Sequence, residues 1–406
     1  MKKELGPNQV LRAGLIGGGA DKSKGESAFI ALRHSASVHL GGTRRITCGA
    51  LHYDPKVAIQ CAAEWPYPIH GYESVGAMLE HLESRPSDER VEFVIIATPN
   101  NCHFMQAMPF IEMGIPVVLE KPMTLTVTEA RQLAAAVEKT GTPLMIFHTY
   151  WGHVMTNFAR FVVQSGLLGK IIGGRADYDQ DWLRLKLESM GVTQAWRAKK
   201  AVCGISCCGG DIGVHGQKHW EFVTGDPVAS IEDASLRTIV PDRELDDVFY
   251  TRCLTHSGAE IVIRAAQVWA GRRNRLYLEV NGTDATLIQD CEKPEEIRIL
   301  RPGKGELTYY RGQIPESDEF LTKPVPKELL ELSYWPGGHP EGLTDAAGHL
   351  YDAFETDVRR YYRGLQPINV GTRYAGVLAG LSHMIFLRAA VLCNQSHDAV
   401  LIEDVE

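Results

Sequence analysis

The sequence predicts an α/β protein that begins with a doubly wound parallel sheet and continues with an α+β domain built on an open, mainly antiparallel sheet. In the first 150 residues, short apolar runs alternate with helical segments. Those runs are apolar throughout rather than at every second position, which is typical of parallel strands covered on both faces. Beyond residue 148, runs rich in Val, Ile, Thr and Tyr are joined by short turns, which favours antiparallel hairpins.

The elements of the first part follow in regular order. Strands are expected at residues 11–16, 45–52, 93–98, 117–120 and 144–148. Helices are expected between them, at residues 26–35, 55–63, 102–113 and 124–139. Asp54 precedes Pro55, a pair that favours a helix cap followed by the first helical residue. Each strand is thus followed by a helix, as a parallel sheet requires.

The second part contains two kinds of segment. Helical patterns are expected at residues 155–165, 215–223, 343–363 and 375–393, and strands at 234–240, 248–254, 260–268, 275–280, 285–289 and 297–300. Residues 302–340 are rich in Pro and Gly and predict a long irregular loop. We therefore expect one domain in residues 1–150 and a second in residues 151–406, with the boundary near 148–152.

Composition limits the functions to consider. A chain of 406 residues exceeds what one core usually holds, and a 44% hydrophobic, 23% charged composition is typical of a soluble globular protein. The net charge of −8 argues against nucleic acid or an anionic membrane as the main partner. No apolar window approaches a membrane span, and the nine cysteines show no paired spacing. We expect a cytoplasmic protein with reduced thiols.

The first strand ends at three glycines, Gly17, Gly18 and Gly19. A strand that stops at glycines and leads into a helix is how dinucleotide-binding folds hold pyrophosphate, because glycine permits a tight turn and a close backbone approach. The third position of that fingerprint is Lys22, and the next glycine is Gly25, so the loop is longer than the minimal form. A glycine-rich turn without a ligand is the alternative.

The end of the second strand bears on the choice of cofactor. An acidic residue there would bind the adenosine ribose of NAD, but this strand ends at His52. Asp54 is expected to cap the next helix instead. The choice between NAD and NADP is open, and the absence of an Arg directly after the strand favours NAD.

Three later motifs are more specific. They are Thr98-Pro99-Asn100-Asn101-Cys102-His103, Glu120-Lys121-Pro122 and Gly209-Gly210-Asp211-Ile212-Gly213-Val214-His215. Together with the glycine loop, they resemble the ordered motifs of the glucose–fructose oxidoreductase, inositol dehydrogenase and rhizopine-catabolism (Gfo/Idh/MocA) family, and the resemblance runs over most of the chain. It implies an NAD(P)-binding Rossmann domain, and a substrate-binding domain whose open sheet helps to form dimers or tetramers.

The resemblance also implies a substrate pocket between the domains, with Lys121 touching substrate and nicotinamide ribose and with Asp211 and His215 lining the pocket. The expected cofactor-binding residues are Gly17, Gly18, Gly19, Gly25, His52, Thr98, Pro99, Asn100, His103, Glu120 and Lys121. The family often has Asp three residues after the motif histidine, where this chain has Lys218. For His103, structural support near the cofactor is favoured over catalysis.

The chemistry of these residues agrees with the resemblance. Oxidising a secondary alcohol needs a base for the hydroxyl proton while hydride leaves to the nicotinamide. Asp211 and His215 are four residues apart, so a helix would place them on one face, where the carboxylate can orient the imidazole. We expect His215 as general base, Lys121 as proton relay and hydroxyl ligand, and Asp211 as orienting group and acceptor of a substrate hydrogen bond. The alternatives are a helix cap for Asp211 and a surface strand end for Lys121.

His219 continues the same helical spacing and raises the alternative of a metal site. Metal sites usually gather ligands from several elements, and no partner is evident in the sequence, so we expect none.

For the substrate, Tyr150, Trp182 and Arg197 offer an aromatic face and polar groups beside Lys121, Asp211 and His215. Residues 338–342 are a candidate loop over a pocket, its own or a neighbour's.

These residues predict an NAD(P)-dependent oxidoreductase that transfers a hydride between nicotinamide and a secondary hydroxyl or ketone of a sugar, cyclitol or glycoside. One alternative is a redox-assisted glycoside transformation, in which tightly bound NAD is recycled. Another is a non-catalytic sugar or nucleotide sensor, against which the intact Lys121, Asp211 and His215 argue. The expected assembly is a homo-oligomer.

Overall fold

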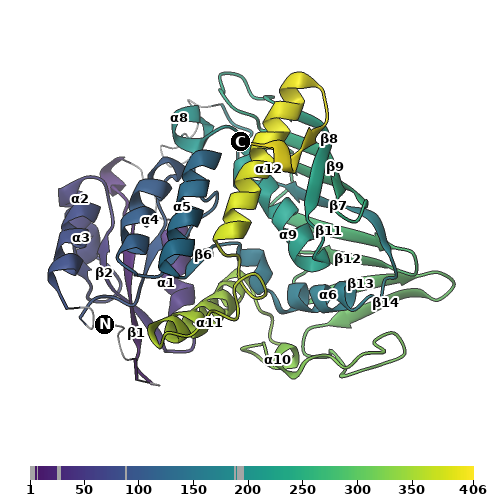
Figure 1. Cartoon of the computed structure of the whole chain (residues 1–406), viewed down its shortest axis with the longest axis horizontal. Coiled ribbons are helices and arrows are strands. Elements are labelled where there is room, and N and C mark those ends of the chain that lie inside the picture. The colour runs from purple at the N-terminus through teal and green to yellow at the C-terminus, as the bar shows by residue number, and fades with distance from the viewer. Residues whose placement is uncertain (1–4, 7, 25–28, 87–88, 187–188, 190–195) are drawn as a thin grey trace.

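The computed structural model describes residues 5–6, 8–24, 29–86, 89–186, 189 and 196–406, which form two sheets with helices between and around them (Figure 1). Sheet A has six parallel strands in the order β3-β2-β1-β4-β5-β6. They are β1 (Leu11–Ile16), β2 (Arg44–Ala50), β3 (His70–Gly71), β4 (Phe93–Ile96), β5 (Val117–Leu119) and β6 (Leu144–Ile146). The predicted doubly wound parallel sheet is confirmed, and its strand order reverses direction between β1 and β4.

Five helices connect these strands. They are α1 (Phe29–Val38), α2 (Pro55–Ala63), α3 (Val75–Ser84), α4 (His103–Glu112) and α5 (Val127–Thr140). Asp54 caps α2 by accepting hydrogen bonds from the amides of Lys56 and Val57, as its place before Pro55 predicted. Thr126 and Glu129 form a reciprocal capping box at the start of α5. Polar caps of this kind fix where α2 and α5 begin.

Sheet B has nine strands in the order β14-β13-β12-β11-β7-β10-β9-β8-β15. They are β7 (Ile171–Asp179), β8 (Val228–Arg237), β9 (Val248–Thr255), β10 (Glu260–Ala266), β11 (Arg275–Gly282), β12 (Thr286–Asp290), β13 (Glu296–Arg301), β14 (Gly305–Tyr310) and β15 (Val400–Leu401). Its paired strands run antiparallel except β7 with β10. The expected open, mainly antiparallel sheet is confirmed.

Three strands of sheet B, β7, β14 and the two-residue β15, did not follow from the sequence pattern. The central strand β7 contains Gly173 and Gly174, which weaken a strand signal. A Cβ on Gly174 would lie 2.1 Å from the Glu279 carbonyl oxygen and 2.7 Å from the Trp220 ring, so close packing requires glycine there. The prediction of an irregular loop at 302–340 was wrong in part, because β14 pairs with β13 and a short helix, α10 (Lys327–Leu330), follows.

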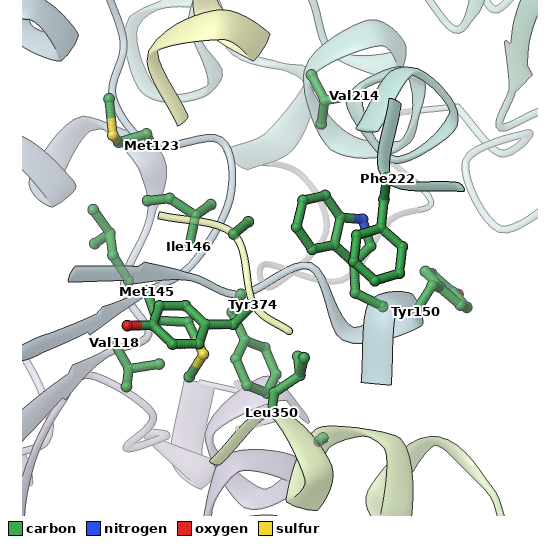
Figure 2. Close-up of a cluster of buried hydrophobic side chains, with 14 of the residues drawn as sticks. Val118, Met123, Met145, Ile146, Tyr150, Val214, Phe222, Leu350 and Tyr374 are labelled. Atoms are coloured by element: carbon green, nitrogen blue, oxygen red, sulfur yellow. The ribbon is translucent and has the colours of Figure 1, made fainter. Parts of the chain in front are cut away.

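The helices of the second part connect both sheets. α6 (Val154–Gln164), α9 (Val214–Thr224) and α12 (Val377–Ser396) lie on the side of sheet B that faces sheet A, as Figure 1 shows. α11 (Leu343–Tyr362) packs on α1, and α12 contacts both α5 and β8. One hydrophobic core therefore runs from sheet A to sheet B. Figure 2 shows a part of it, where Met145 and Val118 of sheet A lie near Leu350 of α11 and near Tyr374.

By length and composition alone, α12 is apolar enough to cross a membrane. The expectation that no segment approaches such a span was therefore wrong for this helix. Its buried side chains include His383, Phe386 and Leu387, and it packs against α5, α9 and β8. A core helix of a folded protein meets the same criterion.

Candidate active site

The predicted cofactor-binding residues lie along one edge of sheet A. Gly17–Gly19 follow β1, His52 follows β2, Thr98–Asn100 follow β4, and Glu120 and Lys121 follow β5. The strands β2, β1, β4 and β5 are consecutive neighbours in the sheet. Because they are parallel, their carboxyl ends share an edge, and the reversal between β1 and β4 is where such sheets bind ligands.

The backbone of the glycine loop fits a dinucleotide phosphate. Gly17 and Gly18 have φ values of 82° and 83°, which favour glycine. A Cβ on Gly18 would lie 1.9 Å from the Ala31 Cβ in α1, and one on Gly19 would lie 2.7 Å from the Leu51 carbonyl oxygen. Side chains are therefore excluded, and the bare backbone stands at the sheet edge. Gly25 lies outside the described residues.

His103 holds the two motif loops together. Its ring nitrogens contact the carbonyl oxygens of Pro122, at 2.8 Å, and of Thr98, at 3.0 Å. The Asn100 side-chain amide donates to the Cys203 carbonyl oxygen, and the Thr98 hydroxyl donates to Gln106. These three side chains are therefore held by contacts within the protein.

Glu120 is buried and is held by a histidine that the motifs did not reveal. His34 of α1 contacts Glu120 Oε1 through Nε2, at 3.0 Å, and the Tyr351 hydroxyl through Nδ1, at 2.7 Å. Burial acts to raise the pKa of Glu120, but the hydrogen bond and charge of His34 together with Lys121 hold it below its usual value. His34 and Tyr351 thereby anchor the loop that carries Lys121.

Lys121 pairs with Asp211 across the two sheets. Its Nζ donates to the Asp211 carbonyl oxygen at 2.6 Å and to Oδ1 at 2.8 Å. The Gln267 side chain donates to Asp211 Oδ2 at 2.7 Å. Burial acts to raise the pKa of Asp211, but the charges of Lys121 and Arg197 and these hydrogen bonds lower it overall. Asp211 is thus an anchored carboxylate that positions the Lys121 ammonium.

The expected orientation of His215 by Asp211 was wrong. Residues Gly209–Gly213 form a π-helical turn before α9, so the four-residue spacing of an α-helix does not align the two side chains. His215 Nδ1 instead faces Nδ1 of His148, 3.4 Å away. Burial, followed by the charge of Lys121, lowers the pKa of His215 well below its ordinary value. His148 follows β6, at the same sheet edge as the motif loops.

Aromatic side chains surround the His215 ring. The rings of Tyr150 and Tyr178 lie 5.3 Å and 5.8 Å from it, centre to centre. The two phenol oxygens are 2.6 Å apart, and Asn274 donates to Tyr150 and accepts from Tyr178. Tyr150, expected to bind substrate, therefore has its hydroxyl engaged within the protein and presents its ring.

Trp182 and Arg197, both expected to bind substrate, lie close together. The Arg197 guanidinium is 5.6 Å from the Trp182 ring, and the Trp182 indole donates to Gln180 at 2.7 Å. The same guanidinium contributes to the lowered pKa of Asp211, which places its charge near the Lys121 pair. The structure thus brings an aromatic face and a cation to the Lys121–Asp211 pair.

Two other expectations concern residues away from this cluster. His219 contacts Gln289, which donates in turn to Thr156, and among the described residues no group of three or more His, Cys, Asp or Glu is arranged to hold a metal ion. In residues 338–342, the His339 carbonyl accepts from Arg311 and the Glu341 carboxylate accepts from the Tyr334 amide. These contacts fix the loop beside the end of β14 and the start of α11.

Comparison with known proteins agrees with this geometry. Residues 11–148 match the model of an oxidoreductase family with an NAD-binding Rossmann fold, and residues 157–288 match the GFO/IDH/MocA C-terminal domain. An uncharacterized oxidoreductase of Bacillus subtilis, YfiI, is 24% identical over 395 residues, which are 95% of this chain and 94% of its own. A levoglucosan dehydrogenase of Pseudarthrobacter phenanthrenivorans is 24% identical over 347 residues, covering 78% of this chain and 84% of its own.

Among solved structures, an inositol dehydrogenase homolog from Azotobacter vinelandii complexed with NAD+ has the same fold, with a TM-score of 0.87 at 24% identity. The match covers 98% of this chain and 99% of that one. The two family models together span most of the chain, in the order that the sequence motifs predicted. The chain therefore belongs to the Gfo/Idh/MocA family of NAD-binding oxidoreductases.

Proposed function

We propose that this protein is an NAD-dependent dehydrogenase or reductase that acts on a secondary hydroxyl or ketone of a sugar, cyclitol or glycoside. The observation that carries the proposal is the Lys121–Asp211 pair, which lies beside the His215 ring at the edge of sheet A where the carboxyl ends of the parallel strands meet. An ammonium has three N–H donors, and Asp211 takes two of them. The third has no partner among the residues that the structure describes, and it is available for a substrate oxygen.

Oxidation removes a hydride from the carbinol carbon of the substrate and a proton from its hydroxyl group. Bound NAD supplies the acceptor for the hydride that leaves the carbon. The hydroxyl proton goes to a residue of this chain, and Lys121 and His215 are the two candidates to accept it. In the reverse direction the same groups return a proton to the ketone oxygen. Glu120 and Asp211 hold Lys121 in place from either side.

A polyhydroxylated ring suits the remaining residues. Trp182 offers an aromatic face, and Arg197 and Asp211 offer charged partners for hydroxyl groups. The related levoglucosan dehydrogenase and the inositol dehydrogenase homolog are named for cyclic polyols or anhydrosugars, which supports this substrate class.

All nine cysteines are free thiols, which supports the cytoplasm as the location.

The test is a substrate panel on the purified chain. Reduction of NAD+, and of NADP+ in a parallel arm, is followed with free sugars, inositols, levoglucosan and other glycosides. We expect turnover of at least one ring polyol with NAD+. Lys121→Met should lower kcat by roughly 10²–10³-fold because it removes the charged donor at the reacting oxygen.

Lys139→Met, an exposed lysine of α5, is the matched control and should keep the wild-type rate. Wild-type turnover in Lys121→Met would contradict the proposal. Release of NAD on denaturation, with glycoside conversion but no net NAD+ reduction, would indicate the redox-assisted transformation instead. Tight NAD binding without any turnover would indicate a sensor.

A further inference from the structure

Three buried imidazoles form a continuous row behind the site. His215 Nδ1 lies 3.4 Å from His148 Nδ1, and His148 Nε2 lies 3.4 Å from His383 Nδ1. At the far end, His383 Nε2 accepts a hydrogen bond from the Met123 backbone amide, at 2.9 Å. The row therefore joins α9, the end of β6 and α12 to the loop that carries Lys121.

The backbone amide determines where the protons lie in this row. An amide always donates, so His383 Nε2 must carry a lone pair, and the proton of the neutral His383 ring is on Nδ1. His383 Nδ1 then donates to His148 Nε2, which leaves the His148 proton on Nδ1. His148 Nδ1 in turn donates to His215 Nδ1. The single proton of the neutral His215 ring is therefore on Nε2. In any other arrangement, two N–H donors or two lone pairs would face each other within the row.

The surroundings keep all three rings uncharged. Each ring is buried, and desolvation lowers the pKa of His215, His148 and His383 well below the ordinary value. The other groups that face the row are the cations Lys121 and Lys218, paired with Asp211 and Glu221, and the imidazoles His103 and His219. An extra proton on any of the three rings would be repelled by these cations. It would also place two N–H donors facing each other within the row.

We propose that His148 and His383 are positioning residues that hold His215 as its Nε2–H tautomer. Of the two ring nitrogens, Nδ1 is occupied by His148, and Nε2 has no hydrogen-bond partner among the described residues. Within the function proposed above, His215 therefore donates a hydrogen bond to the reacting oxygen and does not accept its proton. This replaces the expected role of His215 as general base.

Lys121 is then the residue that exchanges the proton with the substrate oxygen. Ketone reduction starts from the Lys121 ammonium that pairs with Asp211, and an Nζ–H bond breaks as its proton passes to the oxygen of the carbon that receives the hydride. Oxidation is the reverse: the substrate O–H bond breaks, its proton returns to Lys121 Nζ, and the hydride goes to NAD. The Nε2–H of His215 remains in place and stabilises the negative charge that develops on the oxygen, as an oxyanion donor does. Asp211 stabilises the ammonium that results.

The direct test is the tautomer of His215 in the full chain, with and without NAD+. Long-range ¹H–¹⁵N correlation spectra of [¹⁵N]histidine-labelled protein distinguish protonated from unprotonated ring nitrogens, and His215→Asn assigns the signals by their loss. We expect an unprotonated Nδ1 and a protonated Nε2, unchanged between about pH 8 and 5, the range in which an ordinary histidine titrates. A protonated Nδ1 in the wild type would overturn the proposal.

Two substitutions at His148 separate the positioning role from packing. His148→Leu removes the donor to His215 and should release a mixture of tautomers. His148→Asn places its side-chain amide near the position of the lost Nδ1–H and should restore the Nε2–H form. An unchanged tautomer in folded His148→Leu would also contradict the inference.

Kinetics with the substrate found in the panel provide an independent readout. His148→Leu should lower kcat about 10–100-fold, the range of groups that orient a reacting ligand, and His148→Asn should recover most of it. His219→Gln, a buried histidine of the same helix that contacts Gln289, is the control and should keep kcat. Because the spectra need no turnover, failure of the substrate panel and failure of this inference are distinguishable.

Discussion

His219 shows how burial sets the charge of the histidines in this fold. Its side chain is 1% exposed, and desolvation lowers its pKa from 6.5 to about 4. Gln289 satisfies one ring nitrogen, so the neutral ring is accommodated without a counter-charge. His153 follows the same pattern, with a pKa lowered to about 4 by burial. Both rings are neutral in the folded protein under conditions where an unfolded chain begins to protonate them.

This difference predicts acid sensitivity. Because the folded pKa of His219 is depressed, the unfolded state takes up a proton first as the pH falls from 6.5 towards 4, and stability is lost over that window. Between pH 7 and 5 the free energy of unfolding of His219→Gln should fall by about 2 kcal/mol less than that of the wild type. Urea unfolding at both pH values measures this. The exposed His256→Gln should match the wild-type slope, and parallel behaviour of all three proteins would refute the prediction.

At the scale of single elements, the glycine loop after β1 depends on two separate constraints. Gly17 and Gly18 have positive φ values, and Gly18 also packs directly against Ala31 of α1. Gly42, between α1 and β2, has a positive φ of 71° but nothing within 4 Å of the place where a Cβ would stand. The two glycines therefore separate backbone strain from close helix packing.

Gly18→Ala and Gly42→Ala form a matched pair. Both should lose about 1–2 kcal/mol from the left-handed backbone. Gly18→Ala should lose more, and should weaken NAD+ binding at least about tenfold, because α1 must move away from the loop that holds the phosphates. Thermal unfolding and calorimetric titration with NAD+ measure the two effects. Equal NAD+ affinity in the two variants would contradict the assignment of this loop to the cofactor.

At the scale of the whole molecule, the site is assembled by elements far apart in the chain. α11 and α12 return to pack on α1 and α5, and Ala375 pairs with Ile146 at the edge of sheet A. These contacts hold His383 and Tyr351 beside loops of the first 150 residues. On the far side of sheet B, Figure 1 shows no described helix covering the strands.

We propose that copies of the chain associate through that uncovered face, as the resemblance to the family implied. Val262 lies near its centre, between Arg175 and Arg252 on the neighbouring strands. Light scattering after gel filtration should give a multiple of the 45.0 kDa chain mass. Val262→Glu should shift the protein towards the monomer, because the added carboxylate is solvated in the single chain but would be buried in a contact between two copies. Leu378→Glu, exposed on α12, is the control; a monomeric wild type would refute the proposal.

The local chain predicts much of this protein. The bounds of β1 and α2 agree with their apolar pattern and cap, and the family follows from the ordered motifs. The edge on which Gly17, Thr98 and Lys121 lie was also predictable, because parallel strands bring their carboxyl ends together. These features depend on residues that are close together in the chain or on the regular geometry of a parallel sheet. A sequence pattern is therefore enough to predict them.

The tertiary structure alone decided how the proposed catalytic residues are held. His148 and His383 are 235 residues apart, and His34 and Glu120 are 86 apart, so no local pattern links them. The π-helical turn at Gly209–Gly213 moved Asp211 away from His215 and towards Lys121, which the four-residue spacing did not indicate. Side-chain direction and burial depend on which elements pack together. The sequence therefore identified Lys121, Asp211 and His215, and the packing of α1, α9, α11 and α12 decided their partners.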